Sequence, residues 1–323
     1  MATSHTIRAL LTVGVLGAAL GGLLYSRYQH DIERARERIA TGSRIAETPC
    51  GPIEYAVAGD GPPLLIVHGA GGGFDQGLDF GGSLVASGFR IITMSRFGYL
   101  RTPLPNDASA AAQADAHACL LDALNIRRAA VIGASAGAPS SMQFALRHPG
   151  RITALVLLVP ATYVPRAGGA PPMQTPTGTV FLFETILNSD FLFWAATRFA
   201  RETVIRAILA TPPAVVANAT AAEQARIDEL LAHILPVSPR RPGLINDVKV
   251  TSSLQRYELE RIAVPTLAIS LQDDLYGTFD GARYTVEHIP RARFIGYPSG
   301  GHLWVGHQQE IVAEIVTFLK LNR

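Results

Sequence analysis

The fold is decided by residues 129–149, which read AAVIGASAGAPSSMQFALRHP. The first four residues are apolar and suit a buried strand, and the pattern from Ala136 to Arg147 predicts a helix that Pro149 ends. Between strand and helix lies a Gly-x-Ser-x-Gly motif at residues 133–137. Glycines beside the serine permit a sharp turn that lifts the hydroxyl clear of a sheet. We therefore predict Ser135 as a nucleophile; the alternative is an ordinary glycine-rich turn.

Short apolar runs recur on both sides of this stretch, each bounded by turn residues. The runs that we predict as strands are Leu64–Val67, Ile91–Met94, Ala130–Ile132, Leu155–Val159, Leu267–Ile269 and Phe294–Ile295. Near-continuous apolarity indicates strands that are buried on both faces, as in a parallel sheet. Helical patterns lie between the runs, for example at 108–124, and another closes the chain at 311–321. This alternation predicts an α/β fold with a mostly parallel, doubly wound sheet.

The alternation stops between about residues 165 and 250. Proline and glycine gather at 165–178, and an aromatic-rich helical pattern follows from Phe181 to Trp194. A second helical pattern runs from Ala222 to Leu235. We predict a helical insertion here, with an apolar face on its helices.

A serine nucleophile needs a base, and the chain contains nine histidines. His302 follows the last predicted strand and the turn at 299–301, so it could overhang the carboxyl edge of the sheet where Ser135 emerges. We expect His302 to be the base. The histidines that we interpret as structural or surface residues are His68, His148 and His307.

An acid that orients the histidine is expected after the strand that begins near Pro265. Asp273 and Asp274 end that strand, and either one gives the chain order Ser, Asp, His. On the residues alone, both aspartates are candidates for this role.

Acyl transfer also requires hydrogen-bond donors for the developing oxyanion. The predicted strand at 64–67 runs into a glycine loop, residues 68–73, which reads HGAGGG. The Ala70 N–H in the glycine loop and the Ala136 N–H after the serine are our candidate donors. The rival interpretation is a phosphate-binding turn. No Gly-Lys-Ser/Thr follows the loop, and Phe74 stands where a dinucleotide-binding motif would need its third glycine.

Composition limits the other classes of function. The chain has 323 residues, of which 48% are hydrophobic and 17% charged, so a sizeable core is expected. A formal net charge of +2 is too weak to indicate nucleic-acid binding. The chain has only two cysteines, Cys50 and Cys119, which is too few for a disulfide framework, and their spacing fits no metal site. We expect Cys119 to be a buried thiol. No cofactor is expected.

Residues 1–43 are predicted to form a membrane anchor and a charged spacer, separate from the domain at 44–323. Ala9–Tyr25 is an uncharged apolar run that spans about 25 Å as a helix, the short end of a membrane crossing. The alternatives are a signal peptide cleaved near residues 19–21 and a helix packed on the domain. We interpret the charged stretch Asp31–Ala40 as a solvated spacer. Basic residues are more frequent after the apolar run than before it, which places the domain on the cytoplasmic side.

Together these features resemble the α/β-hydrolase superfamily over about Ile53 to Leu321. The ordered landmarks are His68-Gly69, Gly133-Ala134-Ser135-Ala136-Gly137, Asp273-Asp274 and Gly301-His302. The resemblance implies that the insertion at 165–250 is a cap over the site. It also favours Asp274 as the acid, because in the family the acid falls about nine residues past a proline near the strand start, and counting from Pro265 reaches Asp274.

Two positions depart from the family pattern. Residues 95–102 read SRFGYLRT where the family often has Asp-x-x-Gly-x-Gly-x-Ser, and Leu271 replaces the usual glycine before the acid. Neither change touches a predicted catalytic group. The serine at position 135 argues against the dehalogenase and epoxide hydrolase members, which use an aspartate nucleophile.

The resemblance implies hydrolysis of a carboxylic ester or related acyl compound through an acyl-Ser135 intermediate. The apolar insertion indicates a small hydrophobic acyl substrate. Carbon–carbon bond hydrolysis, perhydrolysis and acyl transfer by the same groups are alternatives. A third alternative, from a different class, is a non-catalytic ligand-binding or membrane scaffold protein on this fold.

Overall fold

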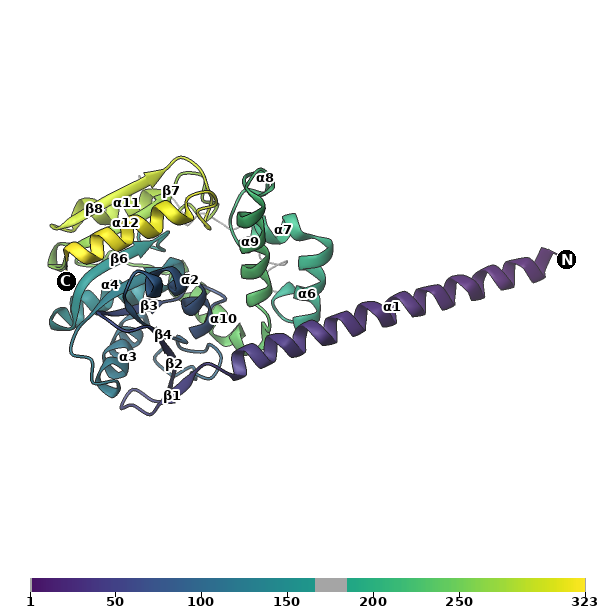
Figure 1. Ribbon diagram of the computed structural model, residues 1–323, viewed down its shortest axis with the longest axis horizontal. Coiled ribbons are helices and arrows are strands. Elements are labelled where there is room, and N and C mark those ends of the chain that lie inside the picture. Colours follow the sequence, from purple (N-terminus) through teal and green to yellow (C-terminus); the bar gives the residue numbers. More distant parts are fainter. Residues whose placement is uncertain (1, 166–184, 323) are drawn as a thin grey trace.

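The computed structural model describes residues 2–165 and 185–322, with side chains from residue 16 onward. Within these ranges the strands form one eight-stranded sheet in the order β1-β2-β4-β3-β5-β6-β7-β8 (Figure 1). The strands are β1 (Arg44–Ala46), β2 (Ile53–Ala58), β3 (Pro63–Val67), β4 (Arg90–Met94), β5 (Ala129–Ala134), β6 (Ile152–Leu158), β7 (Thr266–Leu271) and β8 (Ala292–Tyr297). The pairs β1–β2 and β2–β4 are antiparallel and all other neighbours are parallel. The predicted mostly parallel α/β sheet is therefore confirmed.

The central strands carry apolar side chains into two cores, one on each face of the sheet. In β3, Leu65 and Val67 enter one core, while Leu64 and Ile66 enter the other. Helices α3 (Ala110–Ala123), α4 (Ala138–Arg147) and α11 (Thr278–His288) cover the first face. Helices α2 (Phe74–Ala86) and α12 (Gln308–Leu321) cover the second face. Burial on both faces explains why these strands read as continuous apolar runs.

A helical segment lies between β6 and β7, where the sequence predicts the insertion. From residue 190 to residue 252 its helices are α6 (Asp190–Phe199), α7 (Arg201–Ala207), α8 (Pro213–Ala217), α9 (Ala221–His233), the short 3₁₀ turn η4 (Ser238–Arg240) and α10 (Arg241–Ser252). We call α6–α9 the cap helices; they have an apolar core of their own, which includes Phe193 and Trp194. The start of the predicted aromatic pattern, at Phe181, lies outside the described residues.

The N-terminal helix α1 (Ala2–Ala40) extends away from the domain at its beginning and runs along the cap helices at its end (Figure 1). Tyr28, Ile32 and Ala35 follow one another at helical spacing and are buried in the core of the cap helices. The indole N–H of Trp194 donates to Asp31 Oδ2 at 2.8 Å. The interpretation of residues 31–40 as a solvated spacer is therefore wrong. The apolar stripe is narrow and charged residues surround it, so it does not stand out in the sequence.

No helix in the described part of the chain is both long enough and apolar enough to cross a membrane. The apolar run at 9–25 lies partly outside the residues whose side chains are described. The predicted membrane anchor, and the cytoplasmic placement that depends on it, thus gain no support from the structure.

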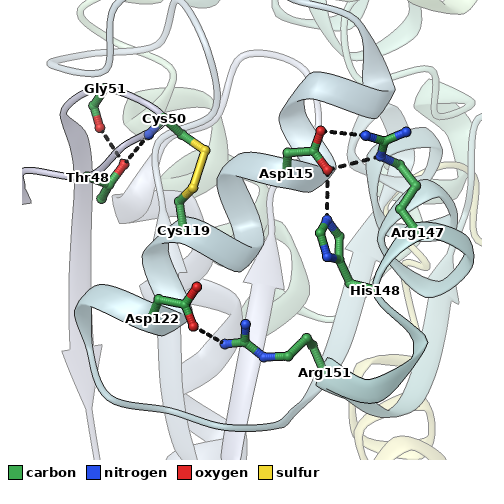
Figure 2. The surroundings of a disulfide bond; sticks show 9 residues. All are labelled: Thr48, Cys50, Gly51, Asp115, Cys119, Asp122, Arg147, His148 and Arg151. Carbon is green, nitrogen blue, oxygen red and sulfur yellow. Dashed lines mark hydrogen bonds and ion pairs between the residues drawn. A yellow bond between two sulfur atoms is a disulfide. The ribbon is translucent and has the colours of Figure 1, made fainter.

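Cys50 and Cys119 form a disulfide, so the expectation of a free thiol at Cys119 is wrong (Figure 2). Cys50 lies in the turn between β1 and β2, and Cys119 lies on α3, 69 residues further along the chain. The hydroxyl of Thr48 accepts from the Cys50 N–H at 3.1 Å and donates to the Gly51 carbonyl at 2.7 Å. The disulfide thus joins the edge of the sheet to the helix layer on one of its faces.

Candidate active site

Ser135 lies at the sharp turn between β5 and α4, in the 3₁₀ turn η1 (Ser135–Gly137). Its φ is +49°, a left-handed conformation that is uncommon for a residue other than glycine. The flanking glycines are required by close packing. A Cβ at Gly133 would lie 2.4 Å from the Ser141 hydroxyl oxygen, and one at Gly137 would lie 2.5 Å from the Val67 carbonyl oxygen. The motif therefore forms the strained strand–turn–helix geometry that exposes a serine at the carboxyl edge of the sheet.

The structure brings His302 and Asp274 to this serine. His302 Nε2 lies 2.9 Å from Ser135 Oγ, and His302 Nδ1 lies 2.8 Å from Asp274 Oδ2. The Asp274 carboxylate is buried and also accepts from the Tyr276 N–H at 2.9 Å and from the Thr278 hydroxyl. An imidazole that donates through Nδ1 to a carboxylate presents its Nε2 lone pair to the serine hydroxyl. The arrangement suits removal of a proton from Ser135.

Asp273 does not contact His302. Its carboxylate accepts from the Gly300 N–H at 3.1 Å and from the Gly301 N–H at 2.8 Å. Both glycines have positive φ, +131° and +64°. Asp273 therefore holds the turn that presents His302, one of the two roles expected for the aspartate that does not reach the histidine.

The glycine loop runs directly beside the serine. A Cβ at Gly69 would lie 3.1 Å from the Ser135 Cβ, so a larger residue could not approach as closely. Within the described residues, the N–H of Ala70 has no hydrogen-bond partner, and Ala70 faces the same cavity as Ser135. Ala136 lies at the start of η1, where N–H groups have no partner within the helix. Ala136 follows the serine directly and Ala70 lines the same cavity, so both stay the predicted donors for an oxyanion.

Side chains that the sequence did not identify hold the glycine loop in place. The Gly71 N–H donates to the Tyr99 hydroxyl at 3.3 Å, and the Gly69 N–H donates to Gln76 Oε1 at 3.0 Å. His68 Nε2 accepts from the Arg96 N–H at 2.9 Å, so Nδ1 carries the proton and donates to the Gly69 carbonyl at 2.7 Å. Burial and the charge of Arg96 lower the pKa of His68 well below its usual value. His68 is therefore a neutral structural residue.

A cavity of about 190 Å³ opens above Ser135, between the sheet and the cap helices. Its apolar lining includes Leu158, Val159, Leu187, Ile208, Leu209, Leu230, Ile234 and Leu244. Among the described lining residues, the charged side chains are Asp79, Arg226 and Glu229. The guanidinium of Arg226 bonds to the Glu223 carboxylate at 2.9 and 3.2 Å and to the Leu303 carbonyl at 2.9 Å. Its positive charge is therefore already paired. Of the two lining carboxylates, Asp79 bonds to His233 Nδ1 at 2.5 Å and Glu229 is exposed to solvent.

Comparison with known proteins adds sequence and structural relatives. The family described as alpha/beta hydrolase fold matches residues 62–207. A 2-hydroxy-6-oxononadienedioate/2-hydroxy-6-oxononatrienedioate hydrolase of Paraburkholderia xenovorans is 30% identical over 285 residues, which cover 83% of this chain and 90% of that protein. YcgS, an uncharacterized hydrolase of Bacillus subtilis, is 38% identical over 107 residues, which are 33% of this chain and 37% of that protein. An alpha/beta hydrolase fold protein from Nakamurella multipartita superimposes with a TM-score of 0.68 at 28% identity, over 86% of this chain and 99% of that chain.

Proposed function

Because the chain belongs to the α/β-hydrolase superfamily and is a hydrolytic enzyme, we propose that it hydrolyses an uncharged, hydrophobic carboxylic ester through an acyl-Ser135 intermediate. One observation carries the proposal. The hydrogen-bonded series Ser135–His302–Asp274 ends in an apolar cavity that also contains the unpaired Ala70 N–H. A nucleophile, its base and an oxyanion donor around one apolar space are the requirements of acyl transfer.

The proposed reaction has two halves. His302 Nε2 takes the proton of Ser135 Oγ as the oxygen attacks the ester carbonyl carbon, and the N–H groups of Ala70 and Ala136 stabilise the oxyanion. The tetrahedral intermediate then loses the alkoxide, which receives the proton from His302 and leaves as an alcohol. Water repeats these steps on the acyl-Ser135 carbonyl, giving the carboxylic acid and the free enzyme. Throughout, Asp274 stabilises the imidazolium form of His302.

The charge of the cavity supports a neutral substrate. A substrate carboxylate placed here would meet Asp79, which His233 already pairs, and the exposed carboxylate of Glu229, neither of which attracts it. Among the described lining residues, Arg226 is the cation available to it, and Glu223 already holds that guanidinium. Placing a substrate carboxylate in an apolar site that offers it no free cation is unfavourable.

Carbon–carbon bond hydrolysis is the second candidate, favoured by the name of the Paraburkholderia relative, which specifies a dienedioate, a dicarboxylate. The same serine, histidine and aspartate could serve it. The described lining residues offer no unpaired cation to a substrate carboxylate, which favours the ester instead. Perhydrolysis and acyl transfer differ from hydrolysis only in the acceptor that attacks the acyl-enzyme, so product analysis with peroxide or alcohol in place of water separates them.

The substrate is tested with a chain-length series of p-nitrophenyl esters and with 2-hydroxy-6-oxo-dienoate acids. We expect kcat/KM to be higher for acyl chains that fill the apolar cavity than for acetate, and lower for an ester that carries a terminal carboxylate than for its methyl-capped analogue. Faster turnover of the dienoate acids than of every ester would instead establish carbon–carbon hydrolysis.

The nucleophile is tested with Ser135→Ala. This change removes the atom that forms the acyl intermediate, so we expect kcat to fall by about 10³-fold or more and labelling by a fluorophosphonate to disappear. Ser83→Ala, at an exposed position on α2, is the matched control and should retain full activity and labelling. Turnover of the Ser135→Ala variant within about tenfold of wild type would contradict the mechanism.

A further inference from the structure

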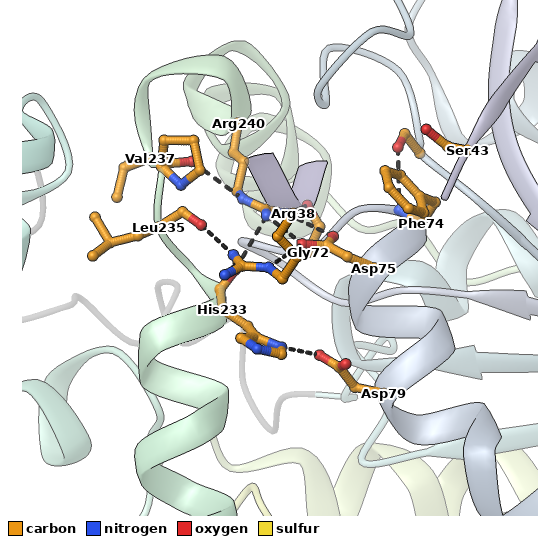
Figure 3. Close-up of polar contacts among 12 residues, drawn as sticks. Arg38, Ser43, Gly72, Phe74, Asp75, Asp79, His233, Leu235, Val237 and Arg240 are labelled. Atoms are coloured by element: carbon orange, nitrogen blue, oxygen red, sulfur yellow. Dashed lines mark hydrogen bonds and ion pairs between the residues drawn. The ribbon is translucent and has the colours of Figure 1, made fainter. Parts of the chain in front are cut away.

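A fully buried arginine, Arg240, contacts the C-terminal part of the glycine loop. The Arg240 guanidinium donates to the Gly72 carbonyl at 2.7 Å and to the Asp75 carboxylate at 2.6 and 3.1 Å (Figure 3). Its remaining N–H groups donate to the carbonyls of Pro236 and His233 at 3.2 and 3.1 Å. A buried guanidinium is tolerated when its charge is paired and its donors are bonded, as they are here. Arg240 thereby joins the segment after α9 to the glycine loop and to the first turn of α2.

The loop is held on both sides of Ala70. Beyond it, a Cβ at Gly73 would lie 3.0 Å from an Arg240 nitrogen, so backbone and guanidinium are in close contact. Before it, Arg96 donates to the carbonyls of His68 and Gly69 at 2.9 and 3.2 Å. The Arg96 guanidinium in turn forms a two-bond pair with Asp247 of α10 at 2.6 and 2.7 Å. Guanidinium groups thus fix the loop carbonyls around Ala70, which leaves its N–H free for the cavity.

The N-terminal helix reaches the same cluster. Arg38, in the last turn of α1, donates to the carbonyls of Leu235 and His233, and its Nε lies 3.7 Å from Asp75 Oδ2 (Figure 3). Burial alone would raise the pKa of Asp75, but the charge and hydrogen bonds of Arg240, with Arg38 next to it, hold that pKa below its usual value. One carboxylate therefore joins α1, the segment after the cap helices and the start of α2.

We propose that Arg240 is a positioning residue for the glycine loop. It anchors the loop beyond Ala70 through the Gly72 carbonyl and Asp75, while Arg96 holds the Gly69 carbonyl of the peptide group that carries the Ala70 N–H, and Arg38 supports Arg240 from α1. This inference rests on the proposed function for its effect on rate, but the structural effect on the loop does not. A positioned N–H stabilises the oxyanion more than the ground-state carbonyl, so its misplacement lowers kcat rather than substrate affinity.

The variants differ in how much of the cluster they disturb. Arg240→Lys keeps the positive charge, but a single ammonium cannot reproduce the two-bond contact with Asp75 together with the bonds to three carbonyls. Arg38→Gln leaves the Arg240–Asp75 pair intact and removes only the support from α1. Arg201→Gln is the matched control, because Arg201 pairs with Asp228 on the exposed side of the cap helices.

Five properties are measured for each folded variant, with the melting temperature as a check of folding. They are kcat and KM on the best ester, Ki of a trifluoromethyl ketone that forms an oxyanion on Ser135, Kd of the matching non-reactive amide, and hydrogen exchange of the peptide that contains residues 68–73. Removal of one oxyanion donor costs about 10²- to 10³-fold in kcat, so misplacement by Arg240→Lys should cost about tenfold or more. Arg38→Gln should cost about two- to fivefold, an order-of-magnitude expectation for the loss of indirect support.

In Arg240→Lys and Arg38→Gln we expect Ki of the ketone to rise in proportion to the fall in kcat/KM and Kd of the amide to stay constant. Hydrogen exchange in residues 68–73 should accelerate. The Arg201→Gln control should change none of these. Unchanged kcat, Ki and exchange in a folded Arg240→Lys variant would overturn the proposal, as would an equal loss of amide binding. If Arg240→Lys does not fold, unchanged exchange and Ki in Arg38→Gln overturn it. Wild-type protein that neither turns over esters nor reacts with a fluorophosphonate contradicts the proposed function instead, and the exchange measurement still tests the positioning.

Discussion

Two adjacent aspartates serve the candidate site in different ways. Asp274 receives the His302 ring nitrogen, whereas Asp273 receives the two glycine N–H groups of the turn before His302. Both aspartates lie in the turn after β7, which ends at Leu271, and their carboxylates bond to different partners. In the proposed mechanism one aspartate therefore acts on the proton transfer directly, and the other acts through the position of the histidine.

Asparagine substitutions separate these roles. Asp274→Asn retains the shape but cannot stabilise the imidazolium, so we expect kcat to fall by about 10³- to 10⁴-fold, the loss seen for the equivalent change in a serine protease triad. Asp273→Asn weakens two charge-assisted hydrogen bonds, so it should lower the free energy of unfolding by about 1–2 kcal/mol and kcat by about tenfold or less. Steady-state kinetics and thermal unfolding of the two variants check this. The reverse order of the two losses in kcat would exchange the assignments.

Among the secondary-structure elements, the strands that the sequence predicts correctly are those with a continuous apolar run. Strands β3, β5, β6 and β7 are buried on both faces and read as apolar runs, whereas β1 has two exposed residues in three and β2 pairs at the antiparallel edge. No strand was predicted over β1 or β2. The reason is that a short edge strand that is partly exposed lacks both the continuous and the alternating pattern.

The disulfide could not be predicted for a different reason. Cys50 and Cys119 meet because α3 packs near the β1–β2 turn, and sequence spacing does not encode that contact. The ion pairs around the glycine loop could not be predicted for the same reason, because their partners are far apart in the sequence. Asp75 and Arg240 are 165 residues apart, and Arg96 and Asp247 are 151 apart. Ser135, His302, Asp274 and the loop donors could be proposed as a site because their order and motifs follow chemistry. The residues that support them are brought together by tertiary packing, which no local pattern records.

Cys119→Ser tests the contribution of the disulfide. The bond closes a loop of 69 residues, and restricting a loop of this length in the unfolded chain stabilises the fold by about 2–4 kcal/mol. We expect the variant to lose free energy of unfolding in this range. Neither cysteine lines the cavity, so kcat should stay near the wild-type value. Reducing agent should destabilise the wild type to the same extent and leave the variant unchanged; equal stability of the oxidised and reduced wild type would contradict a role for the disulfide.

At the scale of the whole molecule, the N-terminal helix is part of the fold at one end and extends from it at the other (Figure 1). Removal of residues 2–23 spares every described α1 residue that packs on the cap helices, from Leu24 to Arg38, whereas removal of residues 2–40 exposes the surface that these residues cover. Full burial of one large apolar side chain is worth about 1.5–3 kcal/mol, so the longer deletion should lower the free energy of unfolding by at least about 2 kcal/mol.

Chemical denaturation of the two truncated proteins measures the difference directly. The shorter deletion is the control and should match the full chain in stability and kcat. Equal stability of both deletions would show that the buried stripe on α1 contributes nothing, and would return residues 31–40 to the solvated role that the sequence suggested.

The left-handed backbone of Ser135 sets a limit on how this protein could be improved. A residue other than glycine held at such a φ costs the fold roughly 1–3 kcal/mol, and glycine would adopt the same turn without that strain. A search for thermostable variants that scores folding alone would therefore favour glycine at position 135. The gain in thermal stability would come from removing the proposed nucleophile, so selection for stability and selection for turnover favour different residues at this position.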